Sequence, residues 1–382
     1  MTRKKITIKP LQNQRVAVIG AGFFGISAAL KLAEKGCRIT IYDKEREGIR
    51  GASYINQNRM HMGYHYPRSA STARSSYIYQ KAFCKMYKEA VVGNFDHYYC
   101  IAKHNSKVSK QEFIEFCDQQ GLPHTKEFPK SITLSKEEID LSIKVPENIY
   151  DANLLRNVLT GLLNREECIK QCYSTEVTGI KKLESGYEIT SKSGGTVHKN
   201  QYDIVINATY SDVNRIVKMA GLKTEEYQYE LCEVPIVKVP WVNRTGCGIM
   251  DGPFFGILPF GFSEEYMLYD VDHSVLERYC GVVPEFKHDI AYYDKEEHRK
   301  PRFQKYIEKA KKYIAEMADV TYLYSIYITR VVLMHKDHDD ARPTEIICHG
   351  DGFYSIFAGK ICNAIPAADR VATEVENYLT QH

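Results

Sequence analysis

The feature that most constrains the fold of this chain lies between Arg15 and Asp43. The run RVAVIG is short, apolar and β-branched, which is typical of a buried strand. GAGFFG follows at once and places Gly20, Gly22 and Gly25 in a G-x-G-x-x-G motif, and ISAALKLAEKG then shows apolar residues at helical spacing. A second apolar run, CRITIYD, ends on Asp43. The stretch therefore predicts a β-α-β unit whose second strand ends on an acidic residue.

Each residue of this motif has a physical role in holding an adenosine dinucleotide. Gly20 permits the tight turn, Gly22 lets the backbone approach a pyrophosphate, and Gly25 allows close packing of helix on strand. The N terminus of the helix faces the phosphates. Asp43 accepts hydrogen bonds from a ribose, which disfavours a 2′-phosphate and therefore NADP. The motif predicts dinucleotide binding; the competing interpretation is a glycine-rich turn in another α/β protein.

Bulk composition restricts the class of function. The chain has 382 residues, more than one hydrophobic core normally serves, so we expect two domains. The net charge is 51 − 48 = +3, which is too small to indicate a nucleic-acid partner. Neither a membrane span nor a signal peptide is predicted, and eleven cysteines without a CxxC pair indicate reduced thiols and a cytoplasmic location. Cys168 and Cys172 lack a histidine pair at zinc-ligand spacing, so no metal site is expected.

Patterns further along the chain differ from those of a nicotinamide dehydrogenase. Residues 174–210 predict three strands with turns at 184–186 and 193–195, followed by a fourth apolar strand. Residues 350–379 predict a strand, a glycine-bearing turn and a terminal helix. Helices are also predicted after the capping-box residue Ser109 and over 301–318, and residues 250–261 predict either a strand above a pocket or a buried hairpin. A second G-x-G-x-x-G motif is absent from the sequence, so a separate NAD(P)H domain is not expected.

This order of elements resembles the D-amino-acid oxidase superfamily of FAD-dependent oxidoreductases. The resemblance covers nearly the whole chain and is strongest in the N-terminal β-α-β unit, in VTGI…GYEIT…YDIVINAT, and in RPTEI…GFYSIFAGKICNAIPAADRVA. It implies non-covalent FAD and an α/β fold with a Rossmann-like, glutathione-reductase-like FAD-binding domain and an interleaved, mostly antiparallel β-sheet substrate domain. We expect the FAD-binding domain in residues 1–90, 146–225 and 326–382, and the substrate-binding or cap domain in 91–145 and 226–325.

Two positions depart from the family pattern. Tyr210 stands where the family usually has a glycine, and Ala358-Gly359-Lys360 stands where its tail usually has a glycine–histidine pair.

The stretch after the acidic residue is similar to a loop of relatives that oxidise L-2-hydroxyglutarate and glycerol 3-phosphate. That loop has the pattern G-x-x-S-x-x-(N/S)…H-x-G-x-x-Y and passes along the flavin, between the ring and the substrate. The matching residues here are Gly51, Ser53, Asn56, His61, Gly63 and Tyr66. The resemblance implies that His61 lies beside the flavin and that Gly63 allows close backbone approach. The alternative is that some of these residues pack or cap the fold.

The resemblance and the residue chemistry together predict a site. The predicted catalytic residues are His61, His65 and Arg330. The predicted cofactor-binding residues are Gly20, Gly22, Gly25, Asp43, Lys44, Ser53, Asn56, His61, Gly63, Val177, Ala208, Gly359, Lys360 and Ile361. The predicted substrate-binding residues are Tyr64, Tyr66, Arg330 and Arg342, since a guanidinium matches a carboxylate bidentately. Either arginine could instead pair with the acidic run at 337–340.

The expected function is oxidation of a small anionic amino acid, amine or 2-hydroxy acid by hydride transfer to FAD, with oxygen or another acceptor taking the electrons. His61 or His65 would accept the substrate proton near neutral pH, and Lys360 would stabilise an anionic reduced flavin. The alternative is a protein that holds FAD without net redox turnover, either as a structural or sensor module or for a flavin-dependent rearrangement.

Overall fold

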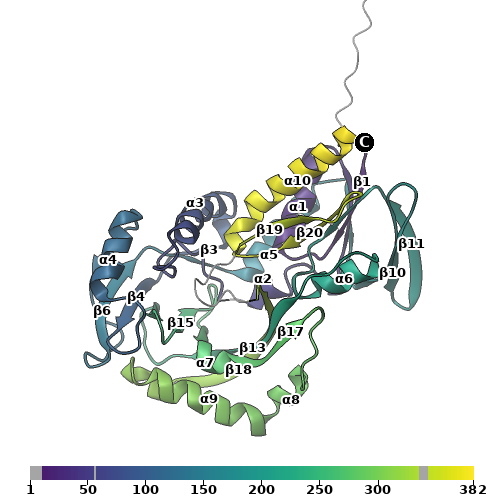
Figure 1. The fold of residues 1–382 in the computed structure, drawn as a ribbon. Coiled ribbons are helices and arrows are strands. Elements are labelled where there is room, and N and C mark those ends of the chain that lie inside the picture. Colours follow the sequence, from purple (N-terminus) through teal and green to yellow (C-terminus); the bar gives the residue numbers. More distant parts are fainter. Residues whose placement is uncertain (1–10, 56, 335–342) are drawn as a thin grey trace, which may run out of the picture. The chain divides into compact units, whose positions relative to one another are not determined.

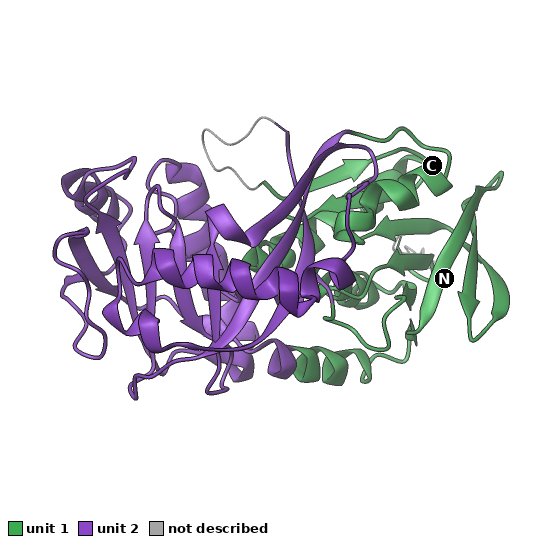
Figure 2. Cartoon of the chain, turned by 90° about the horizontal axis from the view of Figure 1, so that it is seen from below, with its two compact units in different colours: residues 1–50, 156–225, 343–382 green, residues 51–155, 226–342 purple. Residues whose placement is uncertain are grey.

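The computed structural model describes residues 11–55, 57–334 and 343–382. The chain forms two compact units, which Figure 2 shows in different colours. Unit 1 comprises Met1–Arg50, Arg156–Glu225 and Pro343–His382, and unit 2 comprises Gly51–Leu155 and Glu226–Arg342. Within the described ranges, no helix is long and apolar enough to cross a membrane.

Unit 1 is built on a sheet with the strand order β19-β20-β12-β1-β2-β8. All neighbours in this sheet are parallel except β19 and β20. The strands are β1 (Arg15–Ile19), β2 (Arg38–Tyr42), β8 (Ile169–Cys172), β12 (Ile204–Asn207), β19 (Glu345–Cys348) and β20 (Phe353–Phe357). Because β1 lies between β2 and β12, the glycine turn that follows β1 is at the carboxyl edge of the sheet, where α/β folds bind ligands.

Helices and a second small sheet cover the sheet of unit 1. Helix α1 (Phe23–Glu34) contacts β1 and β2 and lies beside α10 (Ala364–Gln381), as Figure 1 shows. A three-stranded meander, β9 (Thr175–Lys182), β10 (Tyr187–Ser193) and β11 (Thr196–Tyr202), packs with α6 (Val213–Met219) against Ala17, Ile19 and Val205. The remaining elements are α5 (Ala152–Leu163), which begins in unit 2, and the 3₁₀ turns η2 (Tyr210–Asp212) and η4 (Ile361–Asn363). Burial on both faces explains why these strands read as continuous apolar runs.

Unit 2 is built on a larger sheet with the order β17-β13-β16-β15-β14-β4-β6-β5, in which β18 also pairs with β13. Only the β4–β14 pair is parallel among the described strands of this sheet. The strands are β4 (Asp96–Ala102), β5 (Thr125–Lys126), β6 (Ile139–Val145), β13 (Tyr227–Lys238), β14 (Thr245–Met250), β15 (Phe255–Pro259), β16 (Tyr266–Asp270), β17 (Val275–Gly281) and β18 (Thr321–Val332). Two short strands, β3 (Val91–Val92) and β7 (Ile149–Tyr150), pair separately.

The two faces of the unit 2 sheet have different coverings. One face packs against α9 (Glu296–Ala310) and η3 (Ala315–Asp319) through Tyr306, Ile314 and Met317. The opposite face packs against α4 (Lys110–Gln119) and residues 62–66, with Tyr99 and Ile143 in the same cluster. The other helical segments of this unit are α2 (Ala52–Ile55), α3 (Ala70–Met86), η1 (Lys88–Ala90), α7 (Val271–Ser274) and α8 (Ile290–Asp294).

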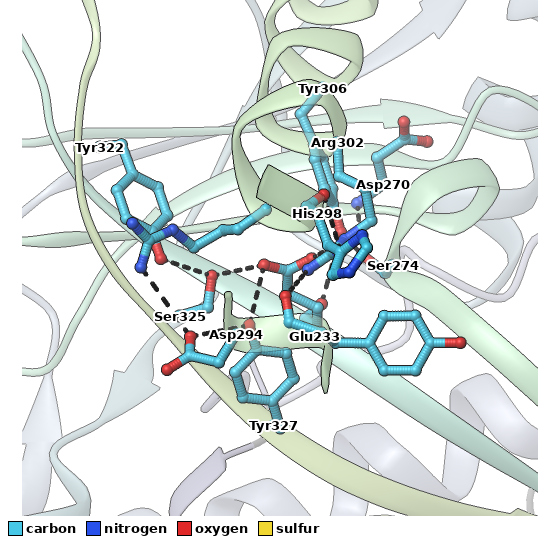
Figure 3. Close-up of polar contacts among 12 residues, drawn as sticks. Glu233, Asp270, Ser274, Asp294, His298, Arg302, Tyr306, Tyr322, Ser325 and Tyr327 are labelled. Atoms are coloured by element: carbon cyan, nitrogen blue, oxygen red, sulfur yellow. Dashed lines mark hydrogen bonds and ion pairs between the residues drawn. The ribbon is translucent and has the colours of Figure 1, made fainter. Parts of the chain in front are cut away.

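A buried carboxylate attaches α9 to its face of the sheet. Glu233 on β13 accepts hydrogen bonds from Arg302 Nε at 2.8 Å and from Ser325 Oγ at 2.6 Å, and Figure 3 shows these donors converging on it. Arg302 also donates to the backbone carbonyls of His298 and Tyr293. A buried charge is tolerated when it is paired and hydrogen-bonded, so this cluster fixes the helix in place.

The predicted fold class is confirmed: a mostly parallel α/β unit is interleaved with a mostly antiparallel sheet unit. The helix after Ser109 begins with a complete capping box to Glu112, and the predicted meander and terminal helix are present. Residues 250–261 form the end of β14, the connection to β15, and β15 itself. They are therefore part of a hairpin, one of the two structures considered for this segment. The helix predicted over 301–318 ends at Ala310, because a turn and η3 follow.

The unit boundaries differ from those expected, apart from the one at 225/226. Of the described residues, those in 51–90, 146–155 and 326–334 lie in unit 2. Strand β18 pairs with β13 along its whole length, so a boundary at 325 would divide one strand. Residues 58–60 pair with 148–150 through hydrogen bonds from Met60 N to Asn148 O at 3.0 Å and from Tyr150 N to Asn58 O at 2.9 Å, which keeps both segments in one unit.

Candidate active site

The glycine turn of unit 1 has the geometry that its sequence predicts. Gly20 has φ +102°, and an added Cβ there would be 2.6 Å from Ala208 O. An added Cβ at Gly25 would be 1.9 Å from Gly20 O, so α1 approaches β1 as closely as only glycine allows. Gly22 is the N-cap of α1, and neither a side-chain cap nor an acidic residue in the first turn competes for its N terminus. An anionic phosphate is therefore the natural partner of this helix end.

Asp43 lies at the end of β2 and stabilises the same turn. Its Oδ2 accepts a hydrogen bond from Ala21 N at 2.6 Å and its Oδ1 accepts one from Glu45 N at 2.8 Å. Partial burial raises the pKa of this carboxyl, while the two backbone donors oppose the rise. Each carboxylate oxygen can accept more than one hydrogen bond, so Asp43 can also receive ribose hydroxyls. The turn thus fits the adenosine diphosphate half of a dinucleotide.

The other predicted residues of unit 1 surround this turn or follow β20. Ala208 N donates to Ile19 O, while Val177 is buried in the core beneath the meander. Lys44 Nζ forms an ion pair with Asp212 at 2.9 Å, which occupies its charge at the surface. Among the tail residues, Gly359 N donates to Thr344 Oγ1 at 2.9 Å, Lys360 is the N-cap of η4, and Ile361 is buried.

Tyr210, at a position where the resemblance led us to expect a glycine, has φ +55°. The left-handed conformation costs a side-chain-bearing residue about 1–2 kcal/mol. The backbone of this loop therefore has the shape that favours glycine although the residue is a tyrosine.

In unit 2, a buried glutamate fixes the histidine-bearing stretch. Glu147 is 1% exposed; its Oε2 accepts from Met62 N at 2.8 Å and its Oε1 from Tyr99 OH at 2.6 Å. His61 Nδ1 lies 4.0 Å from the same Oε1. His97 Nδ1 lies 3.0 Å from Glu147 O, and burial lowers the pKa of His97 to about 3, with the Arg59 charge adding to the effect. Glu147 therefore connects this stretch to Tyr99 on β4 and brings a carboxylate close to the His61 ring.

Three rings of the stretch form one cluster. The centroids of His61 and His65 are 5.4 Å apart, and each lies 5.3–5.4 Å from the centroid of Tyr66. His65 also contacts the ring of Phe254 at 5.7 Å. The structure therefore brings together three of the predicted catalytic and substrate-binding side chains within unit 2.

Tyr64 and Gly63 have packing roles in the structure. Tyr64 is fully buried, its hydroxyl donates to Pro123 O at 2.5 Å, and its ring lies 5.5 Å from Tyr99. A substrate-binding role for Tyr64 stays a prediction, and in the structure its ring and hydroxyl both make contacts inside the core. Gly63 has φ +123°, and an added Cβ would be 3.0 Å from Ala73 O, so packing against α3 already requires a glycine there.

Arg330 is held in an ion pair within the sheet of unit 2. It lies directly opposite Glu230 across β18 and β13, and its Nε donates to Glu230 Oε2 at 3.1 Å. Its Nη2 also contacts Glu230 Oε2, and its Nη1 donates to Tyr269 OH at 2.7 Å. Glu230 is thus a partner of Arg330, while residues 337–340, the alternative partner, lie outside the described residues. A catalytic or substrate role for Arg330 stays a prediction, but its guanidinium is already compensated.

Ser53, Asn56 and Arg342 complete the set of predicted site residues. Ser53 lies in α2, and its backbone oxygen accepts from Tyr150 OH at 2.7 Å. Asn56 and Arg342 lie outside the described residues. In the part of the chain that the structure describes, no group of three or more His, Cys, Asp or Glu side chains is arranged to hold a metal ion.

Sequence reasoning missed Glu147, Tyr99 and Arg59. Glu147 and Tyr99 lie far along the chain from the histidines, and a single strand pattern gives no sign of them. Arg59 lies within the stretch RMHMGYHYPRS, but its surroundings come from β4, β14 and β15.

A parallel sheet with a glycine turn for a dinucleotide, joined to a mostly antiparallel sheet that carries titratable side chains, defines the class of two-domain dinucleotide-binding oxidoreductases. The family model described as FAD dependent oxidoreductase matches residues 15–347. The chain belongs to this family, the D-amino-acid oxidase family, and FAD is its cofactor.

Individual relatives are more distant. The chain is 28% identical over 200 residues to the FAD-dependent monooxygenase kojA of Aspergillus flavus, which covers 51% of this chain and 45% of that protein. It is 22% identical over 268 residues to the FAD-dependent monooxygenase FPY4 of Fusarium mangiferae, covering 69% of this chain and 66% of that protein. The chain thus spans only half to two thirds of the length of these relatives.

Solved structures match over almost the whole chain. Glycine oxidase from Geobacillus kaustophilus matches with a TM-score of 0.67 and 15% identity, over 97% of this chain and 95% of that chain. L-α-glycerophosphate oxidase from Mycoplasma pneumoniae, with FAD bound, matches with a TM-score of 0.70 and 16% identity, over 96% and 95%. At this identity the likeness shows a shared fold.

Proposed function

We propose that this FAD-dependent oxidoreductase oxidises a C–N or C–OH bond of a small anionic substrate, of the amino acid, amine or 2-hydroxy acid type. The bound FAD supplies the hydride acceptor for such a reaction. The residues of the chain bind and orient the substrate and take up the proton that its amine or hydroxyl must lose.

The observation that carries this proposal is the His61–His65–Tyr66 ring cluster beside buried Glu147. An imidazole can take up a proton near neutral pH, and Nδ1 of His61 lies 4.0 Å from the Glu147 carboxylate, so we assign His61 as the base. Proteins of the same fold support the substrate class: they are named glycine oxidase, L-proline dehydrogenase and L-α-glycerophosphate oxidase.

Anaerobic reduction of the bound flavin tests the proposal. The holoenzyme is mixed with a panel of amino acids, N-methyl amino acids, 2-hydroxy acids and phosphorylated alcohols, and bleaching of the flavin absorbance is recorded. Stoichiometric bleaching by one compound supports substrate oxidation. Full retention of the oxidised spectrum across the panel would favour a protein that holds FAD without turnover.

The same assay separates oxidation from monooxygenation. The relatives kojA and FPY4 are named monooxygenases, and a monooxygenase takes its electrons from an external reductant. Bleaching by NADH or NADPH, without bleaching by any compound of the panel, would contradict the proposal. Reoxidation of the substrate-reduced enzyme by air, with release of hydrogen peroxide, would identify oxygen as the acceptor.

The variant His61→Ala tests whether His61 is the base that accepts the substrate proton. We expect the rate of flavin reduction, measured by stopped flow and normalised to bound FAD, to fall by about 10²- to 10⁴-fold. His198→Ala is the matched control, since His198 is exposed on β11 of unit 1. An unchanged rate constant with a lowered Tm would instead make His61 a packing residue.

A further inference from the structure

Arg59 is a buried guanidinium without a compensating carboxylate. It is 5% exposed, and its Nε is buried without a hydrogen-bond partner among the described residues. Its contacts there are weak: Nη1 lies 3.5 Å from His65 Nδ1, and the guanidinium carbon lies 5.8 Å from the centroid of the Tyr99 ring. No carboxylate oxygen of the described chain lies within 4.0 Å of it. Burying an uncompensated charge is costly, so this arrangement calls for an anion.

Half-buried arginines of unit 2 show the contrast. Arg302 is paired with Glu233 at 2.8 Å, and Arg68 with Asp251 at 2.8 Å. Arg330 is paired with Glu230. Each of these guanidiniums has a carboxylate partner, whereas Arg59 is more deeply buried and has none among the described residues.

The sheet provides space for the Arg59 side chain at one position. Gly248 on β14 and Gly256 on β15 lie directly opposite each other, with Tyr99 on β4 and Tyr269 on β16 at the outer ends of the same row. Residues paired across neighbouring strands have their side chains on the same face of a sheet. On this face, Tyr99 and Tyr269 therefore flank two glycines, which leave a gap without side chains. An added Cβ at Gly256 would be 2.6 Å from Arg59 Nη2, and one at Gly248 would be 3.6 Å from it. The paired glycines therefore form a shallow slot that holds the guanidinium.

This slot lies on the same face of the sheet as the ring cluster. Tyr99 belongs to the core cluster formed with residues 62–66, and Arg59 itself contacts His65. An anion bound by Arg59 would therefore lie next to the imidazoles that the proposed function uses.

We propose that Arg59, in the slot floored by Gly248 and Gly256, binds the anionic group of the substrate. This inference rests on the proposed function and assigns its anion-binding residue. The guanidinium donates hydrogen bonds from Nε and Nη2 to a carboxylate or a phosphate, both of which accept such a fork. The anion removes the cost of the buried charge, so binding and stability are coupled.

Two anions serve as probes of the holoenzyme: sodium benzoate for a carboxylate and inorganic phosphate for a phosphate. Each is titrated at constant ionic strength set with NaCl, and two signals are recorded, the perturbation of the flavin absorbance and the Tm. The anion that binds more tightly identifies the group on the substrate. Neither signal requires turnover, so the result is independent of whether a substrate has been found.

The variants are Arg59→Met and Gly256→Ala, with Arg278→Met and Gly161→Ala as their controls. Arg278 is exposed and shares Glu230 with Arg330, so its removal leaves a paired carboxylate. Gly161→Ala adds a methyl that meets no described atom within 4 Å, whereas Gly256→Ala displaces the guanidinium.

We expect Arg59→Met to raise the Kd of the preferred anion by about 30-fold or more. The anion should then no longer raise the Tm of the variant. Gly256→Ala should weaken binding in the same direction without removing the charge, and both controls should bind as the wild type does. Wild-type affinity in Arg59→Met, or in a folded Gly256→Ala if Arg59→Met does not fold, would overturn the proposal. A further outcome is that Arg59→Met loses anion binding while no compound of the substrate panel bleaches the wild-type flavin. Arg59 then keeps its anion-binding role, and the proposed oxidation is rejected.

Discussion

Three buried carboxylates of unit 2 each have hydrogen-bond or ion-pair partners within the unit. Glu233 has Arg302, Glu230 has Arg330, and Glu147 has the Tyr99 hydroxyl and the Met62 amide. At this scale sequence analysis identified the histidines, because their chemistry is visible in the residue type. It did not identify their partners, because a partner is fixed by the approach of strands that are distant in the chain.

His97 offers a test of these buried contacts by pH. Burial and the nearby Arg59 charge lower the pKa of His97 to about 3, from an unfolded value near 6.5. Between these values the unfolded chain binds a proton that the folded protein does not, so the free energy of unfolding decreases as the pH falls. The slope from this one group is at most about 1.4 kcal/mol per pH unit.

We therefore expect His97→Asn, which keeps a donor towards Glu147 O, to flatten the pH dependence of stability between pH 6.5 and 4. Urea unfolding at several pH values measures the slope. An identical slope in the variant and the wild type would show that His97 is not a source of acid sensitivity.

At the scale of elements, the close packing of α1 against β1 depends on Gly25, which has no side chain. Gly25→Ala would place a methyl 1.9 Å from Gly20 O, and backbone cannot move aside as a side chain can. Overpacking of this kind costs about 1–3 kcal/mol or more, so we expect a lower Tm and a lower FAD content per protein.

The control is Gly161→Ala in α5, where an added Cβ meets no described atom within 4 Å. It should raise stability by about 0.5–1 kcal/mol, because alanine favours a helix over glycine. Thermal melts and flavin absorbance distinguish the two variants. Equal FAD content and equal Tm in both would mean that the contact at Gly25 is not limiting.

Short sequence motifs and apolar spacing predicted most helices and strands. They failed where helix formation and burial in the core produce the same apolar spacing. The β-α-β unit and the capping box at Ser109 depend on neighbours in sequence, and both are present. Ile314 and Met317 continue the apolar spacing of α9 and are buried, yet they lie beyond its last residue, Ala310. Apolar spacing reports burial, and a turn with a 3₁₀ segment buries the same side chains as another helical turn.

For the whole molecule, the cofactor prediction follows from unit 1. We expect the purified protein to be yellow and to release FAD into the supernatant on acid precipitation, since the glycine turn and Asp43 suit an adenosine diphosphate half. Chromatography and the absorbance of the pellet provide the measurement. FMN in the supernatant, or colour that stays with the pellet, would contradict non-covalent FAD.

The sequence predicted two interleaved domains, but three of the four predicted boundaries differ from the boundaries of the two units in the structure. The periodic patterns locate strands, while the assignment of a strand to a unit depends on its neighbour in the sheet. Strand β18 illustrates this, since its pairing with β13 takes residues 326–332 into unit 2.

The interleaving has a consequence for how the protein is made. In unit 1, β1 pairs with β12, β12 pairs with β20, and α1 packs against α10. Helix α1 ends at Glu34 and its partner α10 begins at Ala364, so 364 − 34 = 330 residues separate the two packing partners. At about 5–20 residues per second, the ribosome needs roughly 16–66 s to make the chain between them. During that time the face of α1 that packs against α10 is without this partner.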